Sequence, residues 1–97
     1  MSLSFPTNVT AIAVDSSTTA KTIQLPHVET CSGRVVVIFD DTHSAQTHTI
    51  TIETYSGDVI HDNSSTTITL TKNGESVQLL AVLPNKWRVI SFWDGTF

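Results

Sequence analysis

Few side chains in this 97-residue sequence are of the types that carry out catalysis. Cys31 follows His27 by four residues, and a thiol beside an imidazole is the smallest arrangement for nucleophilic catalysis. Nothing in the sequence marks a third group that would orient the imidazole, and pairs at this spacing arise by chance. We therefore interpret Cys31 as a small buried thiol and expect no catalytic residues and no enzyme activity.

Metal binding is the next chemistry to consider. Structural zinc sites use closely spaced His and Cys ligands, but the sequence contains no H-x-H or C-x-x-C pair. Asp40, Asp41, Asp58 and Asp62 do not follow the 12-residue calcium-loop pattern, so we interpret them as turn-forming carboxylates. We expect neither a metal site nor another cofactor. The scattered histidines are His27, His43, His48 and His61.

Aromatic side chains provide a third kind of candidate site. A flat aromatic ring can stack on the C–H face of a sugar, and Tyr55 and Trp93 are the residues that could form such a platform. Aromatic residues near a chain end serve equally well as anchors in a protein interface. A carbohydrate-binding domain that uses Tyr55 and Trp93 therefore remains an alternative to an interface.

The elements that must position these residues are β-strands. Val, Ile and Thr supply 34 of the 97 residues, and branched side chains fit a pleated sheet better than a helix. Alternating apolar and polar residues predict eight short strands, since side chains two apart point to the same face. These are Asn8–Val14, Lys21–Leu25, Arg34–Asp40, His48–Thr54, Asp58–His61, Thr66–Thr71, Ser76–Val82 and Lys86–Trp93. Their core residues should be Ile23, Leu25, Ile50, Ile52, Ile68, Leu70, Val77, Leu79, Trp87 and Val89.

The turn signals predict how the last strands connect. Asn-Gly within Lys72–Glu75 favours a tight hairpin, and Pro84 in Leu83–Lys86 favours a second one, so Thr66–Trp93 should form a meander. One short helical turn is expected in Val28–Ser32. The sequence thus predicts an all-β fold, a single antiparallel β-sandwich or jelly roll of about eight strands over residues 1–97, with residues 1–7 as an N-terminal arm.

Two predicted strands are apolar on both faces. Val35–Phe39 is a continuous apolar run, and the last strand carries Ile90 and Phe92 on the face opposite to Trp87, Val89 and Trp93. One face of each strand should contact the core, and the other should be covered by a neighbouring subunit or a terminal segment. We expect the subunit contacts to involve Val36, Ile38, Ile90, Phe92 and Trp93.

Composition and charge exclude several classes of function. Nine acidic and five basic side chains give a net charge of −4, so no basic surface is available for nucleic acid. The sequence contains neither a signal-peptide pattern nor an apolar run long enough to cross a membrane. With a single cysteine there is no intrachain disulfide, which is typical of a protein made in a reducing cytoplasm.

A series of short motifs runs from Thr22 to Ser91. These motifs are Ile23-Gln24-Leu25-Pro26, Gly33-Arg34-Val35-Val36-Val37-Ile38-Phe39-Asp40, Ile50-Thr51-Ile52, Gly57-Asp58-Val59-Ile60, Ile68-Thr69-Leu70, Gly74-Glu75-Ser76-Val77 and Trp87-Arg88-Val89-Ile90. Their order and spacing resemble a β module that is widespread in bacteriophage tail fibres, tail spikes and other virion-surface proteins.

The resemblance implies a structural role in a virion, usually as a homotrimer. It implies no catalytic residues for this sequence. Because the sequence begins at Met1 and ends at Phe97, we expect a stand-alone protein that is made in the host cytoplasm and attaches to the particle. A capsid decoration or cement protein, bound to itself and to the major capsid protein or other virion proteins, is the leading interpretation. A tail or head fibre tip is the second structural interpretation.

Overall fold

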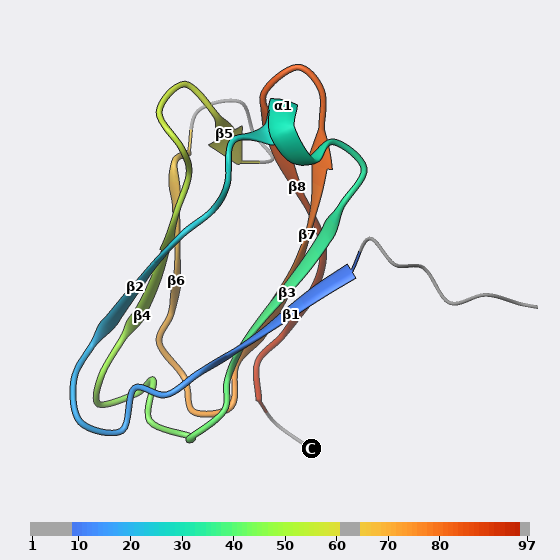
Figure 1. Ribbon diagram of the computed structural model, residues 1–97. Coiled ribbons are helices and arrows are strands. Elements are labelled where there is room, and N and C mark those ends of the chain that lie inside the picture. The colour runs from blue at the N-terminus through green and yellow to red at the C-terminus, as the bar shows by residue number, and fades with distance from the viewer. Residues whose placement is uncertain (1–8, 61–64, 96–97) are drawn as a thin grey trace, which may run out of the picture.

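The computed structural model describes residues 9–60 and 65–95 of the chain, and the regular structure in this part consists of β-strands and one short helix (Figure 1). The predicted N-terminal arm, residues 1–7, lies outside the described residues. Each predicted strand corresponds to an observed strand whose ends differ by two residues or fewer, and the predicted helical turn is present. The elements are β1 (Val9–Val14), β2 (Lys21–Gln24), α1 (Val28–Cys31), β3 (Val35–Asp40), β4 (Ile50–Glu53), β5 (Val59–Ile60), β6 (Thr67–Leu70), β7 (Ser76–Val82) and β8 (Lys86–Trp93).

The strands form two mixed sheets. One has the order β1-β3-β7-β8-β5 and the other the order β2-β4-β6. The pairs β1–β3, β2–β4 and β5–β8 are parallel, so the expected antiparallel sandwich or jelly roll is wrong at the level of topology. The chain crosses from one sheet to the other after each of the first three strands (Figure 1). The chain reverses its direction at each crossing, so two strands separated by two crossings run the same way. β1 is therefore parallel to β3, and β2 is parallel to β4.

The Asn-Gly turn also differs from its prediction. β6 belongs to the three-stranded sheet and β7 to the five-stranded sheet, so Lys72–Glu75 connects the sheets instead of closing a hairpin. The side chain of Glu75 holds the turn, because its Oε1 accepts hydrogen bonds from the backbone N–H groups of Thr71 (2.7 Å) and Lys72 (3.3 Å). The predicted meander is therefore confirmed only for its last two strands, where β7 and β8 form an antiparallel hairpin.

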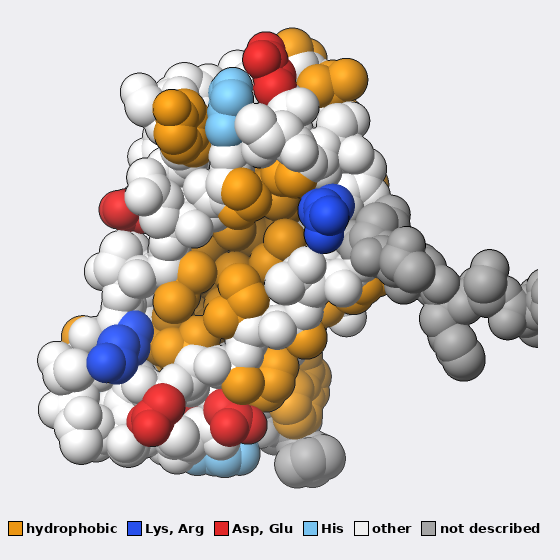
Figure 2. Space-filling view, in the orientation of Figure 1, with side chains coloured by type: hydrophobic (Ala, Val, Ile, Leu, Met, Phe, Trp, Pro, Cys, Tyr) orange, Lys and Arg blue, Asp and Glu red, His pale blue; other side chains and the backbone are white. Residues whose placement is uncertain are grey.

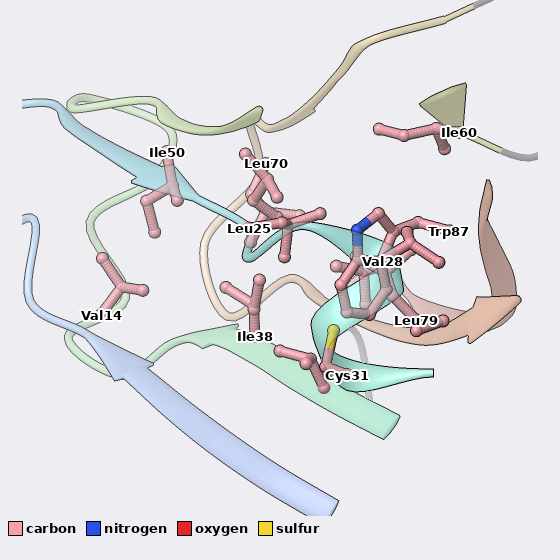
Figure 3. Close-up of a cluster of buried hydrophobic side chains, with 14 of the residues drawn as sticks. Val14, Leu25, Val28, Cys31, Ile38, Ile50, Ile60, Leu70, Leu79 and Trp87 are labelled. Atoms are coloured by element: carbon pink, nitrogen blue, oxygen red, sulfur yellow. The ribbon is translucent and has the colours of Figure 1, made fainter. Parts of the chain in front are cut away.

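The core lies between the two sheets and consists of one cluster of hydrophobic side chains (Figure 3). Of the ten predicted core residues, seven are buried and three are partly buried against the cluster. Complete burial of side chains of this size contributes about 1.5–3 kcal/mol each to folding. The buried seven are Leu25, Ile50, Ile52, Leu70, Val77, Leu79 and Trp87, and the partly buried three are Ile23, Ile68 and Val89.

The faces of β3 correct part of the predicted interface. Val36 and Ile38 lie within the core cluster, opposite Leu79 and Val77 of β7, and are 4% and 0% exposed. Their side chains are therefore unavailable for the subunit contact that we expected of them. Because Val35–Phe39 are all apolar, the sequence lacks the alternation of apolar and polar residues that normally indicates which face of a strand is buried. The outward side chains of β3 are instead Val35, Val37 and Phe39, which are partly buried.

A β-bulge at Ile90 changes the predicted faces of β8. Leu79 pairs with Val89 and Gln78 with Ser91, so Ile90 is an extra residue in β8. Cross-strand partners share a face, and Val77 is buried, so its partner Phe92 lies on the same side of the sheet as the core.

The bulge also assigns Trp93 to the other side of the sheet. Trp93 pairs with Ser76, and Ser76 precedes the inward-facing Val77, so both point outward. The expectation that Phe92 lies opposite Trp87 and that Trp93 shares the face of Trp87 is therefore wrong. Simple alternation along β8 cannot anticipate the extra residue.

Hydrophobic side chains reach the surface along the middle of the face shown in Figure 2, between the two sheets. Charged side chains lie mainly around this strip and toward the two ends of the molecule (Figure 2). Ile12 of β1 and Ile23 of β2 are only partly buried, and these two strands are edge strands of their sheets. Within the described residues, no helix has the length and hydrophobicity that crossing a membrane requires.

Candidate functional site

The first candidate surface is the exposed edge of β8. Ile90 and Phe92 are 47% and 51% exposed, which is unusual for large hydrophobic side chains in a strand. β5 pairs only with Lys86 and Trp87, so within the described chain no strand covers the edge of β8 from Arg88 to Phe92. We call Arg88–Phe92 the β8 edge. It combines exposed apolar side chains with backbone groups that can pair with another strand.

The second candidate is a pocket of about 300 Å³ on the outward face of the five-stranded sheet. Phe39 pairs with Ser76, and Ser76 pairs with Trp93, so these three side chains form one row across β3, β7 and β8. Small Ser76 separates two large aromatic residues, and all three side chains line the pocket. The rest of the lining comes from Val37, Asp40, Asp41, His43 and Gly74.

Asp40 organises the rim of this pocket. It is 3% exposed, and its Oδ2 accepts hydrogen bonds from the backbone N–H groups of Ala45 (2.9 Å) and Gly74 (3.0 Å). Burial alone would raise the pKa of Asp40, but amide groups of Gly74, Ala45, Ser44 and Thr42 stabilise the carboxylate and hold its pKa below the ordinary value of 3.8. The Asp40 carboxylate thus joins the loop after β3 to the turn before β7.

His43 occupies this rim in an uncommon backbone conformation. Its φ is +55°, in the left-handed region that few non-glycine residues adopt. The turn opposite requires Gly74, which has φ +79°, and a Cβ there would lie 3.0 Å from Cε1 of His43. The absence of a side chain at Gly74 therefore lets the imidazole pack closely against the turn, at the mouth of the pocket.

Tyr55 lies in a separate cluster, away from Trp93. Its ring centre is 4.8 Å from that of His27, and it belongs to the turn that precedes β5. β5 pairs with the start of β8 at Lys86, whereas Trp93 is the last residue of β8, about 23 Å further along at the usual rise of a strand. A platform that combines Tyr55 and Trp93 is therefore incompatible with this fold.

His27 is oriented by a residue that the sequence did not indicate. Its Nδ1 lies 3.1 Å from both carboxylate oxygens of Asp58, which is 1% exposed, and its Nε2 lies 3.6 Å from Glu29. Asp58 Oδ2 also accepts a hydrogen bond from the backbone N–H of Val28 (2.9 Å). Because the carboxylate contacts both α1 and the imidazole, Asp58 joins the start of β5 to the helix, and a structural role accounts for this cluster.

Cys31 and His27 are close, but they do not form a nucleophile and base. The thiol donates a hydrogen bond of 3.4 Å to the backbone carbonyl of His27, not to its ring. Burial raises the pKa of the Cys31 thiol above its ordinary value of 9.0, so the thiol remains protonated near neutral pH. The geometry therefore provides no activated thiolate at this pair.

The remaining titratable candidates do not converge on one point. Within residues 9–60 and 65–95, no three His, Cys, Asp or Glu side chains are arranged to hold a metal ion. His61 and Asp62 lie outside the described residues. Sequence reasoning missed the roles of Ser76, Asp40 and His43, because each depends on strand pairing or loop contacts and not on a local motif. Neither a family model nor a curated protein sequence matches this chain.

Proposed function

We propose that this protein is a structural subunit that associates with copies of itself, as a homotrimer, on the surface of a virion. A capsid decoration or cement protein is the specific role that we favour. Two observations support the proposal: the order of motifs from Thr22 to Ser91, and the exposed β8 edge with Ile90 and Phe92. Of the two observations, the exposed β8 edge is the main support for the proposal.

An apolar strand edge is a liability for a protein that remains monomeric. Its backbone groups can pair with any other exposed strand, and monomeric proteins usually protect such edges with charged residues, prolines or covering segments. The β8 edge contains one charged residue, Arg88, together with Val89, Ile90 and Phe92. Association would bury these side chains and satisfy the backbone groups at the same time.

The five-stranded sheet offers a second edge that can receive β8. β1 is the terminal strand on the other side of that sheet, and its Val9 is 44% exposed. The pairings make β1 and β8 run in the same direction. A rotation axis parallel to the strands would bring the β8 edge of one copy beside β1 of the next, and such a head-to-tail contact can close into a ring of three.

Light scattering coupled to size exclusion tests the assembly directly. We expect a trimer of the purified chain at micromolar concentration and a shift to monomer in Phe92→Glu, because a carboxylate cannot be buried unpaired in the contact. Leu83→Glu is the matched control, since Leu83 is 57% exposed but lies in the turn between β7 and β8. A monomeric parent chain, or a Phe92→Glu variant that remains trimeric, would overturn the proposed contact.

Immunogold electron microscopy of purified particles tests the location. A decoration protein predicts label distributed over the heads at many copies per particle. Label confined to the tail or to a fibre tip would replace the decoration role with that of a fibre module. Particles without label would contradict the virion assignment, whatever the oligomeric state of the purified chain.

A further inference from the structure

We propose that the pocket between Phe39 and Trp93 binds the ring of a neutral pyranose sugar. The pocket lies on the outward face of the five-stranded sheet, whereas Phe92 of the proposed assembly contact points to the opposite side. Sugar binding would therefore be a second property of the protein, and it does not depend on the assembly proposed above. The inference rests on the shape of the pocket, its polar rim and its charge.

The dimensions of the pocket suit a single sugar ring. Phe39 and Trp93 belong to strands on either side of β7, and neighbouring strands are about 4.8 Å apart, so their backbones are separated by about 9.6 Å. Ser76 lies between them in the same row and leaves the intervening space open. Trp93 is 40% exposed and can offer an aromatic face to the C–H groups of a sugar. A volume of about 300 Å³ is at the lower end of the range for small-ligand pockets.

The rim offers hydrogen-bonding groups around this apolar slot. Asp41 provides carboxylate acceptors, His43 provides a ring nitrogen, and Ser76 provides a hydroxyl that can donate and accept. The side chains of Asp41 and His43 are exposed, so they can exchange bonds with water for bonds with sugar hydroxyls. A few polar groups around an apolar floor are typical of sites that orient a small ligand.

The charge of the lining selects against acidic sugars. Asp40 and Asp41 both contribute to the pocket, and its lining includes neither lysine nor arginine. The backbone amides around Asp40 keep that carboxylate ionised near neutral pH. A carboxylate or sulfate on the ligand would be repelled by these groups, so a neutral hexose should bind better than its uronic acid.

The rim is held in position before any ligand arrives. Asp40 binds the amides of Ala45 and Gly74, and Asn73 Oδ1 accepts a hydrogen bond of 3.0 Å from the backbone N–H of Gln46. The loop that carries Asp41 and His43 is therefore attached to the turn before β7 at several points. Preorganisation of this kind reduces the ordering cost of binding.

Tryptophan fluorescence provides a selective test. The chain has two tryptophans: Trp87 is fully buried, and Trp93 is exposed at the pocket, so acrylamide should quench mainly Trp93. The probes are the methyl glycosides of glucose, galactose, mannose and N-acetylglucosamine, with glucuronic acid as the charged counterpart. We expect at least one neutral glycoside to protect Trp93 from acrylamide, with a dissociation constant of about 1 mM for a single ring.

Two variants and one control make the result specific. Ser76→Leu should fill the slot and weaken binding at least about tenfold, while Trp93 stays available as the fluorescent reporter. Trp93→Ala should abolish binding measured by calorimetry. Tyr55→Ala is the control, because Tyr55 is also an exposed aromatic residue but lies in a separate cluster, so its loss should leave binding unchanged. Circular dichroism and light scattering on the same samples separate a binding defect from misfolding or altered assembly.

Three outcomes would overturn the inference. The first is that no neutral glycoside gives saturable protection or calorimetric binding up to about 100 mM, far above the expected constant. The second is that glucuronic acid binds as well as its neutral parent, since the acidic lining would then have no effect. The third is that a quaternary ammonium compound such as choline binds and no sugar does, which would make the pocket a cation–π site.

Discussion

At the scale of single residues, Asp40 connects the fold to the pocket. It ends β3, faces the core side of the sheet and is nearly inaccessible, yet it remains ionised because backbone amides stabilise its carboxylate. A buried carboxylate that receives several N–H bonds needs no neighbouring cation. Two connections that are distant in sequence, the loop after β3 and the turn before β7, are thereby attached to one side chain.

We predict that Asp40→Asn lowers the free energy of unfolding at pH 7 by about 1–3 kcal/mol, because the neutral amide lacks the charge that strengthens the hydrogen bonds from the backbone N–H groups of Ala45 and Gly74. Urea denaturation measures the change. Asp15→Asn is the control, since Asp15 also accepts hydrogen bonds from Ser17 but lies at the surface. Equal denaturation midpoints for the parent and Asp40→Asn would contradict the role assigned to Asp40.

The effect of Asp40→Asn on the free energy of unfolding should depend on pH. The pKa of Asp40 is lower in the folded chain than its ordinary value of 3.8, so the unfolded chain takes up the proton first as the pH falls. The stabilisation from Asp40 is therefore complete above that ordinary value and is lost as the pH falls through the folded value. The gap in stability between the parent and Asp40→Asn should accordingly narrow below pH 4, and urea denaturation at a series of pH values measures it.

At the scale of elements, the sequence predicted where strands lie better than how they pair. Alternation places Ile50 and Ile52 on one face with no knowledge of the rest of the chain, and both are buried. Pairing is different, because it depends on segments that are far apart in sequence. An Asn-Gly turn has the same local chemistry whether it closes a hairpin or joins two sheets, so the pattern around Gly74 could not distinguish the two.

The candidate site was predicted even less completely. The exposure of Ile90, Phe92 and Trp93 agrees with their predicted place in a strand that is apolar on both faces. The division of Phe92 and Trp93 between two sides of the sheet depends on the bulge, for which the sequence has no signal. The row Phe39–Ser76–Trp93 depends on the register of three strands, so the pocket could not be recognised from motifs.

We predict that deletion of Ile90 is tolerated, because it removes the extra residue of the bulge and leaves Val89, Phe92 and Trp93 on their present sides. Thermal unfolding by circular dichroism should show a midpoint close to that of the parent. Deletion of Gln78 from the facing strand should be far more damaging, since it shifts the register and turns Val77 away from the core. If both deletions lowered the unfolding midpoint by the same amount, Ile90 would not be the inserted residue.

At the scale of the whole molecule, the two sheets depend on a single core. The three-stranded sheet contributes Ile50, Ile52 and Leu70 to the same cluster that contains Val77 and Leu79 of the larger sheet. Neither sheet could keep these side chains away from water alone, because each buries one face against the other. The described part of the chain should therefore unfold as one cooperative unit.

We predict that Leu70→Ala and Leu79→Ala each reduce the free energy of unfolding by about 2–5 kcal/mol, since both side chains are fully buried. Calorimetry should show one transition in both variants, at a lower temperature than in the parent. Thr69→Ala, at an exposed position of β6, is the control and should change little. A separate early transition in Leu70→Ala would mean that the three-stranded sheet unfolds independently.

The alternation of the chain between sheets also determines the order of events during synthesis. β3 pairs with β1 on one side and with β7 on the other, and β7 leaves the ribosome after β1 to β6. Until Ser76–Val82 is available, the middle of the larger sheet cannot form, and the apolar faces of the earlier strands remain exposed. Sheets built from such distant segments fold slowly, over about milliseconds to seconds. The nascent chain should therefore be most prone to aggregation until Ser76–Val82 has left the ribosome.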